Sequence, residues 1–247
     1  MSTDARRQAI IRYVQEHDLV SVNHLIGEIE GSPATIRRDL RFLEENGVVS
    51  RSHGFVKRIP PSIVSNLPIT EAQTKVAQAA AAMVPENATI LLDSGISAVA
   101  LARELTDRRD LTIITNSLSV ANLMRHAEPH ILLTGGELDG RQEALVGLDA
   151  ENYIRGIHVP CVFLTTTGIR RSEGLVCVTA QQASLKQQMI RSARKTIVLA
   201  DHDKIQKDSV RVFAVFEDVD VIITDAPADP QFAEALKEKG VELIIAE

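Results

Sequence analysis

Seven short runs of branched apolar residues constrain the fold of this chain more than any other feature. The runs cover residues 89–92, 111–114, 131–133, 161–164, 196–199, 219–223 and 241–245. Their hydrophobicity is continuous rather than alternating, which is typical of strands buried on both faces. Helix-like segments at about 70–84, 97–107, 117–126, 180–193 and 229–239 fall between them. This repetition of strand and helix predicts an α/β domain with a Rossmann-like, mostly parallel sheet.

The N-terminal region has a different pattern, in which three short helices precede two short strands. We expect a first helix over residues 4–17 and a second that opens at Val20 and Ser21. The apolar positions of the second helix are Val22, Leu25, Ile26 and Ile29. Two short helices joined by a tight turn, the later one carrying outward cations, indicate a helix-turn-helix.

The cationic helix spans residues 32–47 and has clear start and stop signals. Ser32 is an N-cap candidate and Pro33 then falls at the first helical position. One apolar stripe is formed by Ile36, Leu40 and Leu43. The opposite face carries Ala34, Arg37, Arg38 and Arg41. Such a helix can lie in a DNA major groove, and on its own pattern it can equally present a solvated cationic surface.

A basic hairpin is expected next, over residues 48–52 and 55–59. Arg51, His53 and Lys57 would contact DNA phosphates or a minor groove, although His53 could equally be a turn residue. Three helices with such a hairpin form a winged helix-turn-helix module, which we assign to residues 1–59. The prolines at 60, 61 and 68 predict a linker over residues 60–69, and the α/β domain then covers residues 70–247.

The distribution of charge agrees with one nucleic-acid module on an otherwise acidic chain. The chain of 247 residues has a formal net charge of −6, but residues 1–60 carry nine Lys and Arg against eight Asp and Glu. The remainder carries eighteen basic against twenty-five acidic residues. Positive charge gathered on one segment is the expected footprint of phosphate contact.

Composition also bears on whether the protein spans a membrane, is secreted, or binds a metal. The chain is 45% hydrophobic and 24% charged, with no apolar run of membrane-spanning length and no signal-peptide core, so we expect a cytoplasmic protein. Cys161 and Cys177 form neither a disulfide framework nor a metal-ligand spacing, and Cys161 is expected in the core. We therefore expect no metal and no cofactor.

Small polar residues follow the predicted strands, where α/β sheets bind ligands beyond the carboxyl ends of their strands. Helix N-termini there offer free amides to an anion, while hydroxyl, carboxylate and ammonium groups suit a hydroxylated anionic ligand. Each residue alone could be an ordinary N-cap, but their repetition at one sheet edge indicates a binding site. The candidates are Asp93, Ser94, Gly95, Ser97, Thr115, Asn116, Ser117, Gly135, Gly136, Glu137, Gln182, Lys186, Asp201 and Lys204.

These motifs resemble the DeoR family of bacterial sugar-catabolism repressors over nearly the whole chain. The N-terminal resemblance lies in residues 32–40, Leu43, Glu44, Gly47 and residues 51–54. The C-terminal resemblance lies in residues 92–95, 115–118, 121–122, 134–138, 168–169, Gly174, Lys186 and 200–204. It implies a sensor domain similar to ribose-5-phosphate isomerase and CoA-transferase folds, which binds a phosphorylated sugar or related metabolite. It also implies a homo-dimer or homo-tetramer on double-stranded operator DNA. The candidate DNA contacts are Ser32, Thr35, Arg37, Arg38, Arg41, Arg51, His53 and Lys57.

Four positions depart from the pattern of that family. Phe55 replaces a second wing glycine and is expected to stiffen the wing and to pack. Ile96 removes a hydroxyl from the anion loop, and Gln182 replaces a carboxylate. Asp203 replaces a hydroxyl residue, and its charge would repel a phosphate. These changes suggest an effector that is less anionic or that carries a cationic group.

Two other functions remain as alternatives. A sugar-phosphate isomerase-like enzyme with a fused DNA-binding module would need a base and an electrophile, for which Asp93, Asp201 and Lys186 are the candidates. With Gln182 in place of a carboxylate, one candidate base is missing, and no acid–base pair stands at a motif-like spacing. We therefore expect that the protein is not an enzyme. An interaction scaffold without a ligand would leave the polar strand-end loops unexplained.

Overall fold

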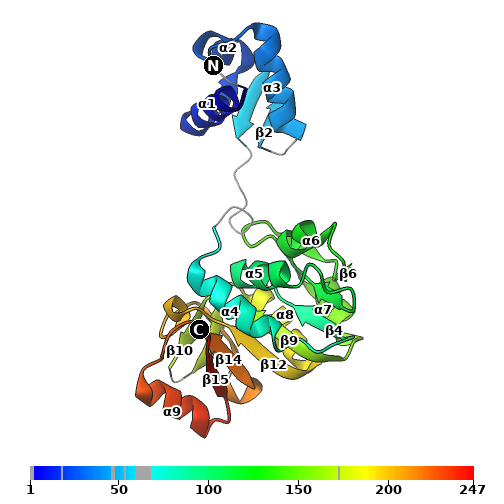
Figure 1. Cartoon of the computed structure of the whole chain (residues 1–247), viewed down its shortest axis with the longest axis vertical. Coiled ribbons are helices and arrows are strands. Elements are labelled where there is room, and N and C mark those ends of the chain that lie inside the picture. Colours follow the sequence, from blue (N-terminus) through cyan, green and yellow to red (C-terminus); the bar gives the residue numbers. More distant parts are fainter. Residues whose placement is uncertain (1–2, 18, 46–47, 53, 59–67, 172) are drawn as a thin grey trace. The chain divides into compact units, whose positions relative to one another are not determined.

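The structure, a computed structural model, describes residues 3–17, 19–45, 48–52, 54–58, 68–171 and 173–247. The chain divides into two compact units, Met1–Pro61 and Ser62–Glu247 (Figure 1). Most of the linker expected at 60–69, together with the wing residue His53, lies outside the described residues. Each unit is described below by itself.

The first unit combines helices with a small antiparallel sheet. Its helices are α1 (Thr3–Glu16), α2 (Val22–Glu28) and α3 (Pro33–Glu45), and its strands are β1 (Leu19–Ser21), β2 (Val49–Ser52) and β3 (Phe55–Arg58). The strands are ordered β1-β3-β2, so the sheet has one strand more than the expected hairpin. The expectation that the second helix opens at Val20 is wrong, whereas Ser21 does open it as its N-cap. Val20 pairs with Val56 of β3, and the Ser21 hydroxyl caps α2 by accepting from His24 N.

The core of the first unit confirms the apolar stripe of the cationic helix. Ile36, Leu40 and Leu43 of α3 are buried, and they pack in one cluster with residues such as Ile10 and Val56. The Ser32 hydroxyl accepts from Thr35 N at 3.2 Å, which confirms it as the cap of α3. Two arginines of α1 reach the buried carboxylate of Asp39, which fixes α3 against α1.

The second unit is built on one parallel sheet, which the seven apolar runs predicted. Its strands are β4 (Thr89–Leu92), β5 (Thr112–Thr115), β6 (His130–Leu133), β9 (Val159–Thr165), β12 (Ala193–Leu199), β14 (Val221–Thr224) and β15 (Glu242–Ile245). They are ordered β15-β14-β12-β9-β4-β5-β6, and every neighbouring pair is parallel.

Helices cover both faces of this sheet, so the strands are buried on both sides, as their composition predicted. The helices are α4 (Glu71–Ala81), α5 (Ile96–Glu104), α6 (Leu118–Met124), α7 (Leu148–Arg155), α8 (Ala180–Arg191) and α9 (Pro230–Glu238). Successive residues of β9 alternate between two cores. Cys161 and Phe163 join the core that includes α4 and α5, whereas Val162 and Leu164 join the core that includes α8.

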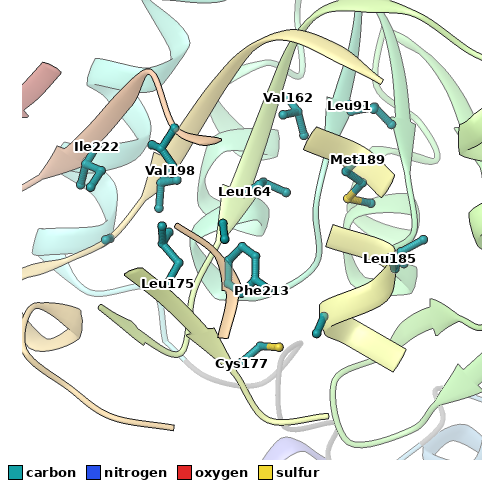
Figure 2. Packing of buried hydrophobic residues seen from close by; sticks show 14 of the residues in the cluster. Leu91, Val162, Leu164, Leu175, Cys177, Leu185, Met189, Val198, Phe213 and Ile222 are labelled. Carbon is teal, nitrogen blue, oxygen red and sulfur yellow. The ribbon is translucent and has the colours of Figure 1, made fainter. Parts of the chain in front are cut away.

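A second, antiparallel sheet covers part of the α8 side and was not expected. It has the order β10-β11-β13, with β10 (Gly168–Arg170), β11 (Gly174–Cys177) and β13 (Arg211–Ala214). Figure 2 shows Leu175 and Phe213 of this sheet packed with Leu164 of the parallel sheet. A hairpin of β7 (Glu137–Asp139) and β8 (Ala144–Val146) and the helix α7 were also missed. These elements are three to eight residues long and include none of the seven apolar runs, so they carry little periodic signal.

Candidate ligand cavity and DNA-contact face

The parallel sheet has one topological switch point, between β4 and β9. From β4 the chain adds β5 and β6 on one side, and it later adds β12, β14 and β15 beyond β9 on the other. The connections therefore diverge at the carboxyl ends of β4 and β9. In open α/β sheets such a crevice is the preferred place for a ligand.

A cavity of about 210 Å³ lies at this switch point. It brings together the start of α5, the end of β9, the end of β11, α8 and the short 3-10 helix η1 (His202–Lys204). The lining residues are Ser94, Gly95, Ile96, Ser97, Gln142, Thr165, Thr166, Thr167, Cys177, Val178, Gln182, Lys186 and Lys204. Six of the predicted ligand residues are among them: Ser94, Gly95, Ser97, Gln182, Lys186 and Lys204.

The N-terminus of α5 opens into the cavity. Gly95 is its N-cap, with a φ of 107°, and thus supplies no side-chain acceptor for the first amides of the helix. A Cβ at Gly95 would lie 3.0 Å from the Thr165 hydroxyl oxygen, so glycine also permits this close packing. The first-turn amides and the helix dipole together favour an anion at this end.

Asp93 and Lys186, both expected to contact a ligand, bind each other instead. The Lys186 ammonium donates to Asp93 Oδ2 and also to the Thr165 carbonyl oxygen at 2.9 Å. Asp93 Oδ2 further accepts from Thr165 N and from its hydroxyl, both at 2.8 Å. Both side chains are buried, so the pair forms a neutral support beneath the cavity.

The charge that remains at the cavity is positive. Lys186 and Lys204 are the only charged residues among the described ones that line it, and Lys186 is neutralised by Asp93. Lys204 therefore provides the available cation. An ammonium group beside an uncapped helix N-terminus suits an anionic ligand.

Several predicted ligand residues stabilise the loops around the cavity and do not line it. Ser117 caps α6 through Val120 N, while Asn116 donates to the Leu145 carbonyl oxygen at 3.1 Å. A Cβ at Gly136 would lie 2.5 Å from the Val146 carbonyl oxygen, so this position needs glycine for close packing. The cavity lining likewise omits Thr115, Gly135 and Glu137.

Asp201 also has a different environment from the one expected. It is buried outside the cavity lining, and its Oδ2 accepts from Gln73 Nε2 of α4 at 3.2 Å. Its other oxygen has no hydrogen-bond partner among the described residues. Asp201 precedes η1, so its contact with Gln73 fixes the turn that carries Lys204.

The four departures from the family pattern have different structural outcomes. Ile96 does line the cavity, and Gln182 both lines it and completes the N-terminal capping box of α8 with Thr179. Asp203 does not line it, and its side chain is 80% exposed. Of the changes that suggested a less anionic effector, Ile96 and Gln182 thus lie at the cavity and Asp203 does not. Phe55 is 44% exposed, so the expectation that it packs is wrong.

The sequence did not single out several cavity residues as ligand candidates. Thr165 is the last residue of β9, Thr166 and Thr167 follow it, and their hydroxyl-rich run was the available signal. Cys177 comes from β11, a strand that was not predicted. Burial raises the pKa of the Cys177 thiol, and it raises that of Cys161 to about 11, so both thiols stay protonated at neutral pH. Cys161 is a core residue, as expected.

In the first unit, the arginines of α3 face solvent. Arg37, Arg38 and Arg41 are exposed on the side away from the buried stripe. A hollow beside them is lined by Val22, Asn23, Arg37, Arg51, Ser52 and Gly54. It joins α3, the start of α2 and the hairpin of β2 and β3 in one concave surface, of which Val22 and Asn23 were not predicted.

Arg51 forms an ion pair with Glu44, which limits its availability for the expected contact with DNA. Its Nε donates to Glu44 Oε2 at 2.8 Å, and its backbone N donates to Glu44 Oε1 at 3.2 Å. These contacts tie the hairpin to the end of α3. Lys57, by contrast, is exposed on the outer face of β3.

Helices with an outward cationic face, attached to a hairpin, define the first unit as a winged helix-turn-helix. Residues 6–61 match the DeoR-like helix-turn-helix domain, and residues 69–226 match the DeoR C terminal sensor domain. The chain thus belongs to the DeoR family and is a DNA-binding transcriptional regulator.

Two relatives match over almost the whole chain. The transcriptional repressor AccR of Agrobacterium fabrum is 33% identical over 91% of this chain and 90% of its own. The glycerol-3-phosphate regulon repressor of Escherichia coli K12 is 30% identical over 98% of this chain and 99% of its own. Among solved structures, ribose 5-phosphate isomerase A from Methanocaldococcus jannaschii aligns at 20% identity over 55% of this chain and 54% of its own, with a TM-score of 0.41.

Two features are absent from the ranges of residues that the structure describes. None of the helices within those ranges is long and apolar enough to cross a membrane. Within the same ranges, no group of three or more His, Cys, Asp and Glu side chains is arranged to hold a metal ion.

Proposed function

We propose that the protein represses carbohydrate-catabolism genes and that a small hydroxylated anion, such as a sugar phosphate, controls it from the cavity. The observation that carries this proposal is the cavity at the β4–β9 switch point, whose lining joins a helix N-terminus, hydroxyl groups and Lys204. The glycerol-3-phosphate regulon repressor, which is matched over 99% of its length, supports the class of genes.

The ligand is proposed to bind with its anionic group at the start of α5. The amides of the first turn and Lys204 would hold that group, while the hydroxyl of Ser97 would bind a hydroxyl of the ligand. The volume of about 210 Å³ suits a small metabolite. Binding would shift the population of forms that can bind DNA.

On the DNA side, α3 is proposed to enter the major groove. Arg37 and Arg38 would contact bases, with Thr35 or Arg41 beside them, while Ser32 and Lys57 would contact the backbone. The domain is small, so specific binding would use a homo-dimer or homo-tetramer on a symmetric operator. The proposed location is the cytoplasm.

The ligand proposal is tested by thermal unfolding of the full chain against triose, pentose and hexose phosphates and their unphosphorylated counterparts. We expect a phosphorylated sugar at a hundredfold excess over its Kd to stabilise the protein by about 2.7 kcal/mol. Lys204→Met should abolish the shift, whereas Lys207→Met, a nearby lysine outside the lining, should keep it. Equal shifts in the wild type and Lys204→Met would contradict the proposed site.

The DNA proposal is tested with a duplex that the wild-type chain selects from a random pool. Arg38→Ala should weaken specific binding by roughly 1–3 kcal/mol if Arg38 contacts a base. Arg109→Ala, which removes an exposed arginine of the second unit, is the matched control and should leave the affinity unchanged. Unchanged affinity of Arg38→Ala at moderate salt would show that the recognition helix is wrongly assigned.

A further inference from the structure

Phe55 lies at the tip of the β2–β3 hairpin and is partly exposed. It is the first residue of β3, directly after Gly54, and it is 44% exposed. Its neighbours across the sheet are Ser52 on β2 and Ser21 on β1. Both of these neighbours are small residues.

The hairpin tip is held beside the recognition helix. Val22 N, at the start of α2, donates to the Gly54 carbonyl oxygen at 2.8 Å. Gly54 also lines the hollow that contains Arg37 of α3. The residue next to Phe55 is therefore part of the same surface as the proposed base-reading arginines.

We propose that Phe55 is a further DNA-contacting residue, whose ring packs against deoxyribose and base edges in the minor groove next to the α3 site. This inference rests on the proposed role of α3. Apolar side chains at such positions contact sugars and base steps in minor grooves. The ring thus adds an uncharged contact to a wing whose basic residues are expected to contact phosphates or a minor groove.

Charge favours DNA as the occupant of this tip over an apolar protein surface. Arg37 lies in the adjoining hollow, and Lys57 is exposed on the same outer face as Phe55, two residues further along β3. Duplex DNA presents phosphates and uncharged sugar surfaces side by side. An apolar partner would instead have to bury these cations without compensation.

Leu19 provides a matched control on the same face. It is 59% exposed and pairs with Lys57, whereas Ser21 on the same strand pairs with Phe55. Leu19 is therefore an exposed apolar residue that lies further from the tip. A contact made by the tip requires Phe55 and not Leu19.

The test uses the full chain and a duplex selected from a random pool by the wild type, with A·T pairs flanking the site. Phe55→Ser should weaken binding roughly 10- to 100-fold, because a buried aromatic contact is lost, and Phe55→Leu should weaken it less. Leu19→Ser should bind as the wild type does. The slope of log affinity against log salt should not change in Phe55→Ser, because no phosphate contact is removed.

Methylation of the duplex by dimethyl sulfate then locates the contact. This reagent modifies guanine N7 in the major groove and adenine N3 in the minor groove. The wild type should protect both, and Phe55→Ser should lose only protection of flanking adenine N3. Unchanged affinity and adenine protection in Phe55→Ser would overturn the inference, as would equal losses in Leu19→Ser.

The outcomes also separate this inference from the role of α3. If guanine N7 protection persists in Phe55→Ser and disappears in Arg38→Ala, the role of α3 stands whatever Phe55 does. If the wild type protects no guanine N7 and Arg38→Ala binds normally, the role of α3 fails, and the inference about Phe55 fails with it. Circular dichroism of Phe55→Leu and Phe55→Ser checks that the wing remains folded.

Discussion

At the scale of single residues, the cavity depends on an ion pair that removes two charges from it. Asp93 follows β4 and Lys186 lies on α8, 93 positions later, and they meet beneath the cavity. From the sequence, Asp93 is recognisable as a charged residue after a strand, and Lys186 as a charged residue within a helix. The sequence does not show that they neutralise each other, because the contact depends on how α8 packs over the sheet.

Lys186 and Lys204 should therefore differ when each is replaced by methionine. Lys186→Met leaves the buried Asp93 carboxylate without its ammonium partner, and should lower the free energy of unfolding by about 3–5 kcal/mol. Lys204→Met should leave stability nearly unchanged. Urea unfolding of both variants measures the difference. Adding Asp93→Asn to Lys186→Met should restore part of the loss, and equal stability of the two single variants would contradict the assigned roles.

At the scale of elements, the apolar strands of the parallel sheet were predictable, and the strands of the antiparallel sheet that covers part of it were not. Each of the seven apolar runs became a strand of the parallel sheet, because burial on both faces demands continuous hydrophobicity. β10 and β11 begin with Gly168 and Gly174, which carry no propensity signal for strands. The cavity residue Cys177 was missed for that reason.

Gly174 should tolerate no side chain. Its φ is +112°, and a Cβ there would lie 2.1 Å from the Ala214 carbonyl oxygen of β13. Gly174→Ala should therefore destabilise the second unit by roughly 2 kcal/mol or more. Gly140→Ala, where the added carbon meets nothing within 4 Å, is the control. Thermal unfolding compares the two, and a similar midpoint for both would contradict the close packing of β11 and β13.

At the scale of the whole molecule, the two units have separate cores. The buried apolar residues of the first unit form one cluster from Ile10 to Val56, and those of the second unit form two clusters on either side of the parallel sheet. The change of composition near the prolines at 60 and 61 predicted this division. It could not predict the contacts of β1, whose three residues resemble the start of a helix.

Separate cores should unfold separately. Leu40→Ala removes a fully buried side chain from the first unit and should cost it about 2–5 kcal/mol, a large share of the stability of so small a domain. Amide hydrogen exchange should then accelerate across residues 10–56 and stay unchanged across 76–246. Leu92→Ala, in the second unit, should do the opposite. Faster exchange in both units of either variant would show that they unfold together.

The order of strands has a consequence for synthesis on the ribosome. β9 lies between β4 and β12, so the parallel sheet lacks this inner strand until residues 159–165 have emerged from the ribosome. The first unit needs only residues up to 61, and N-terminal domains generally fold first as a chain is made. For part of its synthesis, each nascent chain therefore carries a finished DNA-binding module without the cavity that is proposed to regulate it.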